Sequence, residues 1–322
     1  MDIKNIKPNV VTASFQDKIW LFHGPPGTWK TTVATGDTEY TLLAAYEIGF
    51  KFIPGIKVVK LSSWAGLKDL VRQLDDDEVR KMYKTIAIDT IGLSYKSCIS
   101  YICGRKGVQE IGEIPYGQGY AMAKNEFEKT ISLIPQLGYG LILIAHSEEL
   151  NDEKNGVSAK VDIDKRPSSV IKGMADFILY LRKEPIDGTD GEMGVYAYSQ
   201  LSNPNIEVKS RARFFPPRIF FTYEEIQKGL KTAIQEQNKF FNTKSEEEAN
   251  FEVYKEEEVD LESLRGEVVN LVKELAETPL QPRVINTVEK ELEGTRIGQT
   301  TKVHIPALYS LRDQLLELKK SL

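Results

Sequence analysis

Cysteine and histidine are scarce in this chain, which has two cysteines and three histidines among its 322 residues. Cys98 and Cys103 have no histidine or further cysteine near them that would complete a metal-ligand set. The histidines are dispersed as well, at His23, His146 and His304. These absences exclude a disulfide-stabilised secreted scaffold and a metal hydrolase. We expect a reduced protein with two incidental thiols.

Long apolar runs are also missing from the sequence. The best run, Leu141–Ala145, falls far short of the ~20 residues that a membrane-spanning helix needs. The segment Met1–Val11 has no apolar stretch of the kind that a secretory signal requires. Hydrophobic residues make up 41% of the chain and charged residues 28%, as in ordinary globular proteins. We therefore expect a cytoplasmic protein without a membrane partner.

Acidic charge is concentrated in one short segment. Between Thr243 and Glu262, nine acidic residues accompany two lysines, a net charge of −7, whereas the whole chain carries −5. The remaining residues thus carry +2, so the overall acidity does not exclude a nucleic-acid partner. The pattern predicts a core over residues 1–240, an acidic linker over 241–260 and a helical domain over 261–322.

Short apolar segments alternate with helical patterns through most of the core. The expected strands are 19–23, 40–46, 56–61, 85–89, 141–145 and 176–181, and the expected helical segments are 64–74, 121–137, 169–174 and 223–240. The polar stretch Ser147–Pro167 shows no periodicity, and we expect a loop there. Strands that alternate with helices predict an α/β fold with a mostly parallel central sheet covered on both faces.

A turn rich in glycine and proline follows the first strand and carries the strongest motif. Residues 24–31 have the sequence GPPGTWKT, which fits the phosphate-binding pattern G-x-x-x-x-G-K-[ST] except at Trp29. Converging backbone N–H groups, the Lys30 ammonium and the Thr31 hydroxyl would hold a polyphosphate and its Mg²⁺. The expected nucleotide-binding residues are Gly24, Pro25, Pro26, Gly27, Thr28, Trp29, Lys30, Thr31 and Thr32.

Trp29 is a real departure from this motif. Glycine in its place tolerates a positive φ and keeps a side chain away from the phosphates. The Trp29 side chain therefore either points outwards, where it could stack on adenine or a neighbour, or weakens nucleotide binding. The alternative to a phosphate site is a plain strand-to-helix turn, which the flanking strand and helix disfavour.

Three polar residues end other apolar strands of the core. Asp89 could be a second ligand of Mg²⁺ at the carboxyl edge of the sheet, where ligands of α/β proteins bind. Glu47 could polarise an attacking water, and His146 could sense the γ-phosphate and pass its state to the next segment. Simpler roles stay open: a helix cap for Asp89, a solvated acid for Glu47 and a structural part for His146.

A basic strand-like segment follows Ile206–Val208. Alternation would place Lys209, Arg211 and Arg213 on one face. These cations could reach a phosphate on the next subunit or a nucleic-acid backbone. Alternatively, they form a solvated strand edge that limits aggregation.

The order of these features resembles the RecA-like P-loop NTPase core. It is more specifically similar to the phage-encoded, AAA-type ATP-binding proteins related to RecA that act as single-strand DNA annealing recombinases. The stretches that carry the resemblance are YEIGF at 46–50, IPGI at 53–56, 85–92, PYGQGY at 115–120 and 138–147. The likeness spans roughly residues 19–227, and it implies a RecA-like fold with a small C-terminal helical unit.

The resemblance implies ATP and Mg²⁺ as cofactors in a homo-oligomeric ring or filament. Thr31 and Asp89 would hold Mg²⁺. The catalytic residues that it implies are Lys30, Glu47, His146, Lys209 and Arg211, with the last two acting across a subunit interface. If a phage encodes the chain, it would act in the cytoplasm of the host cell.

The same resemblance implies single-stranded DNA as a partner. The segment 147–167 would bind it through Lys154, Lys160, Lys165 and Arg166. This segment also carries acidic residues, so repeated weak contacts along an oligomer are expected rather than strong binding by one subunit. The tail from residue 261 is similar to helical tails of phage recombinases, which implies a single-strand-binding protein or another recombination protein as a further partner.

Three functions fit these features. The first is ATP-dependent annealing or strand pairing of single-stranded DNA, with an ATPase activity that Trp29 could weaken. The second is a nucleotide-binding regulatory or scaffold module with little hydrolysis that binds a partner through its C-terminal helices. The third, a helicase or helicase loader, shares the core but requires translocation.

Overall fold

The computed structural model describes residues 11–152, 156–186, 188–243, 260–292 and 294–320. These residues belong to two compact units, one within 10–250 and the other within 251–322. Most of the predicted acidic linker, 244–259, lies outside the described residues. The predicted linker boundaries therefore stay a prediction.

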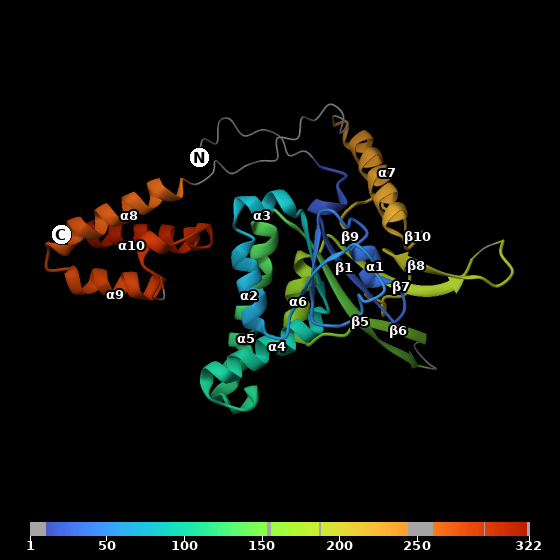
Figure 1. The fold of residues 1–322 in the computed structure, drawn as a ribbon, viewed down its shortest axis with the longest axis horizontal. Helices are drawn as coiled ribbons and strands as arrows, with labels where there is room; N and C mark the ends of the chain where they lie inside the picture. The colour runs from blue at the N-terminus through green and yellow to red at the C-terminus, as the bar shows by residue number, and fades with distance from the viewer. Residues whose placement is uncertain (1–10, 153–155, 187, 244–259, 293, 321–322) are drawn as a thin grey trace. The chain divides into compact units, whose positions relative to one another are not determined.

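The larger unit is built on one mixed sheet (Figure 1). Its strands are β1 Ile19–Gly24, β2 Thr41–Ala45, β3 Lys57–Lys60, β4 Thr85–Asp89, β5 Gly140–Asp152, β6 Gly156–Val161, β7 Phe177–Pro185, β8 Met193–Tyr198, β9 Lys209–Ser210 and β10 Arg218–Phe220. The main order is β10-β8-β7-β1-β5-β4-β2-β3, with β6 on β5 and β9 on β7. The strands from β7 to β3 in this order pair in parallel, and β8, β9 and β10 add antiparallel pairs.

Helices cover both faces of this sheet, as Figure 1 shows. The helices of the larger unit are α1 Lys30–Ala34, α2 Trp64–Gln73, α3 Asp77–Met82, α4 Ile91–Lys106, α5 Gln118–Gln136, α6 Lys165–Met174 and α7 Tyr223–Phe241. One core joins side chains of α2, α4, α5 and α6 to the sheet, and a second core joins α1 and α7 to the opposite face. The predicted α/β architecture with a mostly parallel sheet is confirmed.

Alternation along each strand assigns its side chains to these two cores. Leu21 of β1 lies in the core under α2 and α4, whereas its neighbours Trp20 and Phe22 lie in the core under α1 and α7. The second core is strongly aromatic, because Trp20 stacks between Phe15 at 4.7 Å and Phe177 at 4.2 Å. This burial of β1 on both faces fixes the strand that leads into the phosphate-binding motif.

Helix boundaries follow from capping residues. Ser63 accepts a hydrogen bond from the Gly66 N–H at the start of α2. Thr90 caps α4 by accepting from the Leu93 N–H, and Gly107 ends this helix in the left-handed conformation with φ 68°. Thr90 therefore fills the capping role that the sequence left open for Asp89.

The segment 147–167 is not a loop, and this prediction was wrong. β5 runs past the sheet to Asp152, and β6 returns beside it in antiparallel register, so that the two form a hairpin (Figure 1). Ala159 and Val161 are buried at the base of the hairpin, and α6 begins soon after at Lys165. The part of β5 that lies in the hairpin, residues 147–152, contains one apolar residue and therefore shows no apolar alternation. The alternation in β6, at Val157, Ala159 and Val161, covers only six residues.

The C-terminal unit contains α8 Leu261–Ala276, α9 Gln281–Leu292 and α10 Ile305–Lys320. It has its own apolar core, formed by Leu264, Val268, Leu275, Val284, Leu292, Leu308, Leu311 and Leu315. Among the described residues, no helix is both long and apolar enough to cross a bilayer. Cys98 and Cys103 are buried on α4 and form no disulfide with each other.

The start of β5 generates a stability prediction. A Cβ atom on Gly140 would lie 1.8 Å from the Gln16 carbonyl oxygen, so Gly140→Ala must displace backbone. We expect a loss of about 3 kcal/mol in the free energy of unfolding, measured by urea denaturation with tryptophan fluorescence. Gly173→Ala in α6 is the matched control: a Cβ there meets nothing within 4 Å, so it should leave stability unchanged or raise it slightly. If both substitutions changed the free energy of unfolding equally, the close contact between Gly140 and Gln16 would be contradicted.

Candidate nucleotide-binding site

The phosphate-binding motif begins at the end of β1, where neighbouring backbone leaves no room for a side chain. A Cβ on Gly24 would lie 2.6 Å from the Leu181 carbonyl oxygen on β7, so only glycine fits at the end of β1. The chain then turns through Gly27 with φ 75° and Trp29 with φ 55° before α1 begins at Lys30. Left-handed residues of this kind curve the backbone into the concave shape that anion-binding loops use.

Trp29 retains the backbone conformation that glycine usually supplies. Its φ and ψ of 55° and 27° are left-handed, and its side chain is 53% exposed, so the indole points outwards. A left-handed conformation costs a non-glycine residue on the order of 1–3 kcal/mol. Of the two alternatives for Trp29, the structure therefore shows the one in which the indole points outwards and does not occupy the loop.

Lys30 is the buried cation of this loop. Its ammonium donates hydrogen bonds to the carbonyl oxygens of Gly24 and Pro25, both at 2.8 Å, and contacts the Thr28 hydroxyl at 3.2 Å. Its exposed fraction is only 6%. The positive charge therefore lies within the loop and holds its two ends together.

The Thr31 hydroxyl and the Asp89 carboxylate lie side by side. Thr31 Oγ1 donates to Asp89 Oδ2 at 2.7 Å and so joins α1 to the end of β4. Asp89 is buried, and this burial raises the pKa of its carboxyl, while the Thr31 hydrogen bond opposes the rise. The pair presents a hydroxyl and a carboxylate, the oxygen ligands that Mg²⁺ prefers.

Glu47 and His146 complete the same edge of the sheet. The backbone N–H groups of Tyr46 and Glu47 donate to the Asp89 carbonyl oxygen at 2.6 and 3.1 Å. His146 is aligned with Gly24 in the β1–β5 ladder, and its Nε2 lies 3.4 Å from Glu47 Oε1. His146 Nδ1 is buried and has no hydrogen-bond partner among the described residues. Acid and imidazole therefore form a polar pair beside the phosphate loop.

Comparison with known proteins agrees with this geometry. Residues 16–214 match the AAA domain family, a family of P-loop NTPases. This chain belongs to the AAA domain family. It is also similar to the SPbeta prophage-derived uncharacterized protein YorG of Bacillus subtilis (strain 168). The two are 26% identical over 334 aligned residues, which cover 99% of this chain and 98% of that protein.

An AAA domain implies a magnesium-bound nucleotide, and the residues of this domain fit one. The left-handed loop residues, the Lys30 ammonium and the adjacent Thr31 and Asp89 oxygens make a donor set suited to phosphates and Mg²⁺. Lys30 would bind phosphate, and Thr31 with Asp89 would hold Mg²⁺. A bound Mg²⁺ supplies Lewis-acid stabilisation of phosphoryl oxygens.

His23 is a residue of this site that the sequence analysis did not single out. It is fully buried, and its Nε2 lies 2.6 Å from the Glu207 carbonyl oxygen. Because a carbonyl only accepts, Nε2 carries the proton, and Nδ1 accepts from the Ser147 hydroxyl at 2.9 Å. Burial lowers the pKa of His23 to about 4, so the ring is neutral. A histidine inside an otherwise apolar strand was the signal that could have identified it.

This histidine links the phosphate loop to the hairpin. His23 immediately precedes Gly24, and Ser147 immediately follows His146. Glu207 continues the connection, because its carboxylate accepts from the Val161 N–H of β6 at 2.9 Å and from the Lys172 ammonium of α6. The end of β1, the base of the hairpin and α6 are thus one hydrogen-bonded assembly.

The residues predicted to bind DNA lie around that hairpin. Lys160 of β6 is exposed opposite Glu148 of β5, and Lys165 and Arg166 are exposed at the start of α6. The Arg166 guanidinium lies 4.0 Å from the centre of the Tyr120 ring. Lys154 lies outside the described residues.

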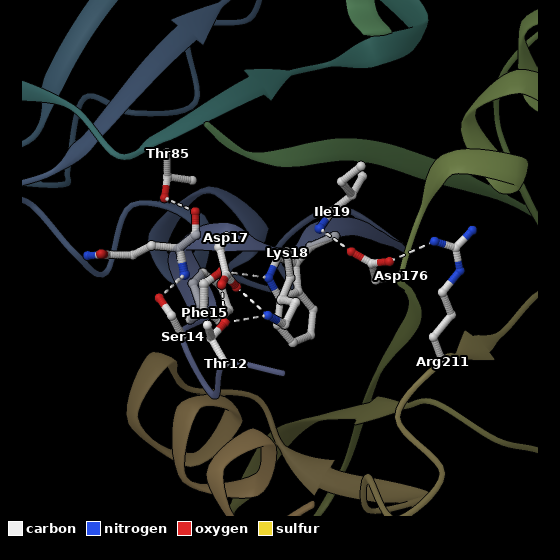
Figure 2. Close-up of polar contacts among 11 residues, drawn as sticks. Thr12, Ser14, Phe15, Asp17, Lys18, Ile19, Thr85, Asp176 and Arg211 are labelled. Carbon is white, nitrogen blue, oxygen red and sulfur yellow. Dashed lines mark hydrogen bonds and ion pairs between the residues drawn. The ribbon is translucent and has the colours of Figure 1, made fainter. Parts of the chain in front are cut away.

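Lys209 and Arg211 lie away from the phosphate loop, on and just after β9, and Figure 2 shows Arg211 beside Asp176 near the start of β1. Arg211 binds Asp176 at 2.9 Å and the Gly173 carbonyl oxygen at 2.8 Å, and Asp176 in turn accepts from the Ile19 N–H at the start of β1. Lys209 donates to the Lys172 carbonyl oxygen at 2.8 Å. The length of β1, about 17 Å at 3.3 Å per residue, separates Arg211 from the phosphate loop. Lys209 is level with Leu21 through Ile178 and lies about 10 Å from Gly24 along the strand direction. These cations are therefore not part of the site within their own subunit.

The left-handed backbone of Trp29 generates a prediction. Trp29→Gly should raise the free energy of unfolding by about 1 kcal/mol, because glycine adopts this conformation without strain. It should also preserve or raise the affinity for magnesium-ATP, measured by calorimetry. A fall in affinity would show that the indole contacts the nucleotide.

The buried imidazole of His23 generates a second prediction. The unfolded chain binds a proton at this histidine below about pH 6.5, whereas the folded chain resists it down to about pH 4. Stability should therefore fall as the pH drops through this window, by about 3 kcal/mol in total at 1.4 kcal/mol per pH unit. His23→Asn should make the dependence shallower, as measured by urea denaturation followed by tryptophan fluorescence. The carboxylates titrate in the wild-type protein and in the variant alike, so they do not cause a difference between the two. Identical slopes of stability against pH would therefore contradict the burial of His23.

Proposed function

We propose that this protein is an ATP-binding phage recombination protein that binds single-stranded DNA as an oligomer and promotes annealing or strand pairing. The observation that carries the proposal is the continuity of β5. This one strand bears His146 at the nucleotide edge and runs without interruption into the hairpin at 147–161. Nucleotide state and hairpin position are therefore linked through a single rigid element.

The contacts around His146 support this link. Its Nε2 faces Glu47, and its carbonyl oxygen accepts from the Asp162 N–H, where the hairpin returns to the core, at 2.9 Å. His23 and Ser147 add a second connection, from the phosphate loop to the hairpin base. A change in the position of His146 would thus be transmitted to the hairpin rather than absorbed by a loose joint.

The charges around the hairpin are suited to weak, repeated contacts with a nucleic-acid backbone. Lys160, Lys165 and Arg166 are exposed, and Arg166 lies against an aromatic ring, a surface on which bases also stack. The exposed Glu148 opposite Lys160 limits the attraction that one subunit provides. Several subunits along one strand would restore affinity through multivalency.

The position of Lys209 and Arg211 supports oligomerisation. Because Arg211 lies at the edge opposite the phosphate loop and the Lys209 ammonium is bound to carbonyl oxygens of α6, a contact with ATP requires the nucleotide of a neighbouring subunit. Their head groups are already fixed by α6 carbonyl oxygens and Asp176, which makes them pre-oriented cations. The prophage origin of the relative YorG agrees with a role in phage DNA metabolism.

A regulatory or scaffold module is the second candidate. The C-terminal helices form a separate unit with its own core, and Ile285 of α9 is 52% exposed there. Such a unit could bind a partner protein, including a single-strand-binding or recombination protein. In this case nucleotide binding would control the partner, and DNA binding by the larger unit would not be required.

ATP hydrolysis with and without single-stranded DNA, with DNA binding followed in parallel, tests these functions. We expect DNA binding that depends on magnesium-ATP, lost in Lys30→Ala because the loop loses its buried cation. The combined variant Lys160→Gln, Lys165→Gln and Arg166→Gln should weaken DNA binding roughly tenfold or more, with unchanged nucleotide affinity. DNA binding without turnover would indicate annealing with ATP as a structural ligand. Absence of DNA binding in every nucleotide state would favour the scaffold.

A further inference from the structure

A second lysine lies at the phosphate loop, outside the sequence motif. Phe177, Leu179 and Leu181 of β7 lie in the core shared with α1, on the same face of the sheet as the loop. Side chains alternate along a strand, so Lys183 belongs to this face too. It is the first residue of that series to be exposed, because β1 has ended and no longer covers it.

The geometry places the Lys183 ammonium against the loop. Leu181 already touches the position of Gly24, where a Cβ would lie 2.6 Å from the Leu181 carbonyl oxygen. Two residues further along β7, Lys183 Nζ lies 3.4 Å from the position that a Cβ on Gly27 would take. Gly27 is one of the left-handed residues that give the loop its concave shape. The ammonium therefore stands beside the anion-binding backbone.

The backbone of Lys183 is fixed while its side chain is exposed. Lys183 pairs with Val195 in the β7–β8 ladder, and Val195 is 1% exposed. The Lys30 side chain is not exposed in this way: it is buried, and its ammonium donates to two carbonyl oxygens of the loop. A lysine on a rigid strand with an exposed head can reach a ligand without moving the backbone.

We propose that Lys183 is a second phosphate-binding cation, which contacts the polyphosphate of the nucleotide held by the loop. This inference rests on the proposed nucleotide binding. A polyphosphate keeps excess negative charge after Mg²⁺ has bound, and an ammonium is a compact point charge suited to it. Lys30 would hold the phosphates from within the loop, and Lys183 from the side of β7.

Arg182 provides a matched control from the same strand. It precedes Lys183, carries the same charge and lies on the opposite face of the sheet, where its nearest acid is Glu184 at 3.9 Å. Lys183→Gln and Arg182→Gln therefore change the net charge equally, but only the first removes a cation from the loop.

Calorimetric titration of the full-length protein with magnesium-ATP and with magnesium tripolyphosphate tests the proposal. We expect Lys183→Gln to weaken both affinities about tenfold, Arg182→Gln to leave them unchanged, and Lys183→Arg to retain most of the wild-type affinity. The wild-type affinity should also decrease more steeply with salt than that of Lys183→Gln. Urea denaturation would show that the variants are folded.

The outcomes separate this inference from the proposed function. If the wild-type protein binds the ligands and the two variants, Lys183→Gln and Arg182→Gln, bind them with equal affinity, the role of Lys183 is overturned. The proposed nucleotide site is then unaffected. A loss with ATP but not with tripolyphosphate would assign Lys183 to the nucleoside and overturn its phosphate role. Failure of the wild-type protein to bind either ligand would overturn both.

Discussion

Parallel pairing aligns the carboxyl ends of β1, β5, β4 and β2, and the polar groups of the nucleotide site lie along that aligned edge. The register places Gly24 of β1 beside His146 of β5, and Asp89 of β4 beside Ile144 of the same strand β5. The hydrogen bond from Thr31 to Asp89 then joins the first helix to this edge. Because strands buried on both faces cannot shift register without exposing apolar side chains, the site is fixed by the core.

Burial shifts the pKa values of two polar groups at this edge, Asp89 and His23. Asp89 and His23 are both buried, and each loses hydration that its hydrogen bonds partly replace. The result is a carboxyl with a raised pKa and a histidine that stays neutral. Neutral His23 donates to Glu207 and accepts from Ser147, so its tautomer connects the phosphate loop to the hairpin. Hydrogen bonds thus connect the strand that leads into the phosphate loop to the base of the hairpin.

Much of the larger unit could be predicted from local patterns. The apolar runs before Gly24 and Asp89 identified β1 and β4, and the loop motif identified Lys30 and Thr31. The hairpin at 147–161 was missed, because its first strand, residues 147–152, contains a single apolar residue and shows no apolar alternation. Lys183 was missed for a different reason: it is far from the motif in sequence, and only the pairing of β7 with β1 places it there.

The sequence by itself determined the phosphate motif, the alternation of apolar strands with helices in most of the core and the acidic composition of residues 243–262, because these depend on local periodicity and composition. The tertiary structure alone decided that Arg211 faces away from the loop of its own subunit and that Lys183 faces toward it. Both outcomes depend on strand order and direction. These are set by long-range burial in the sheet, which no local stretch of sequence encodes.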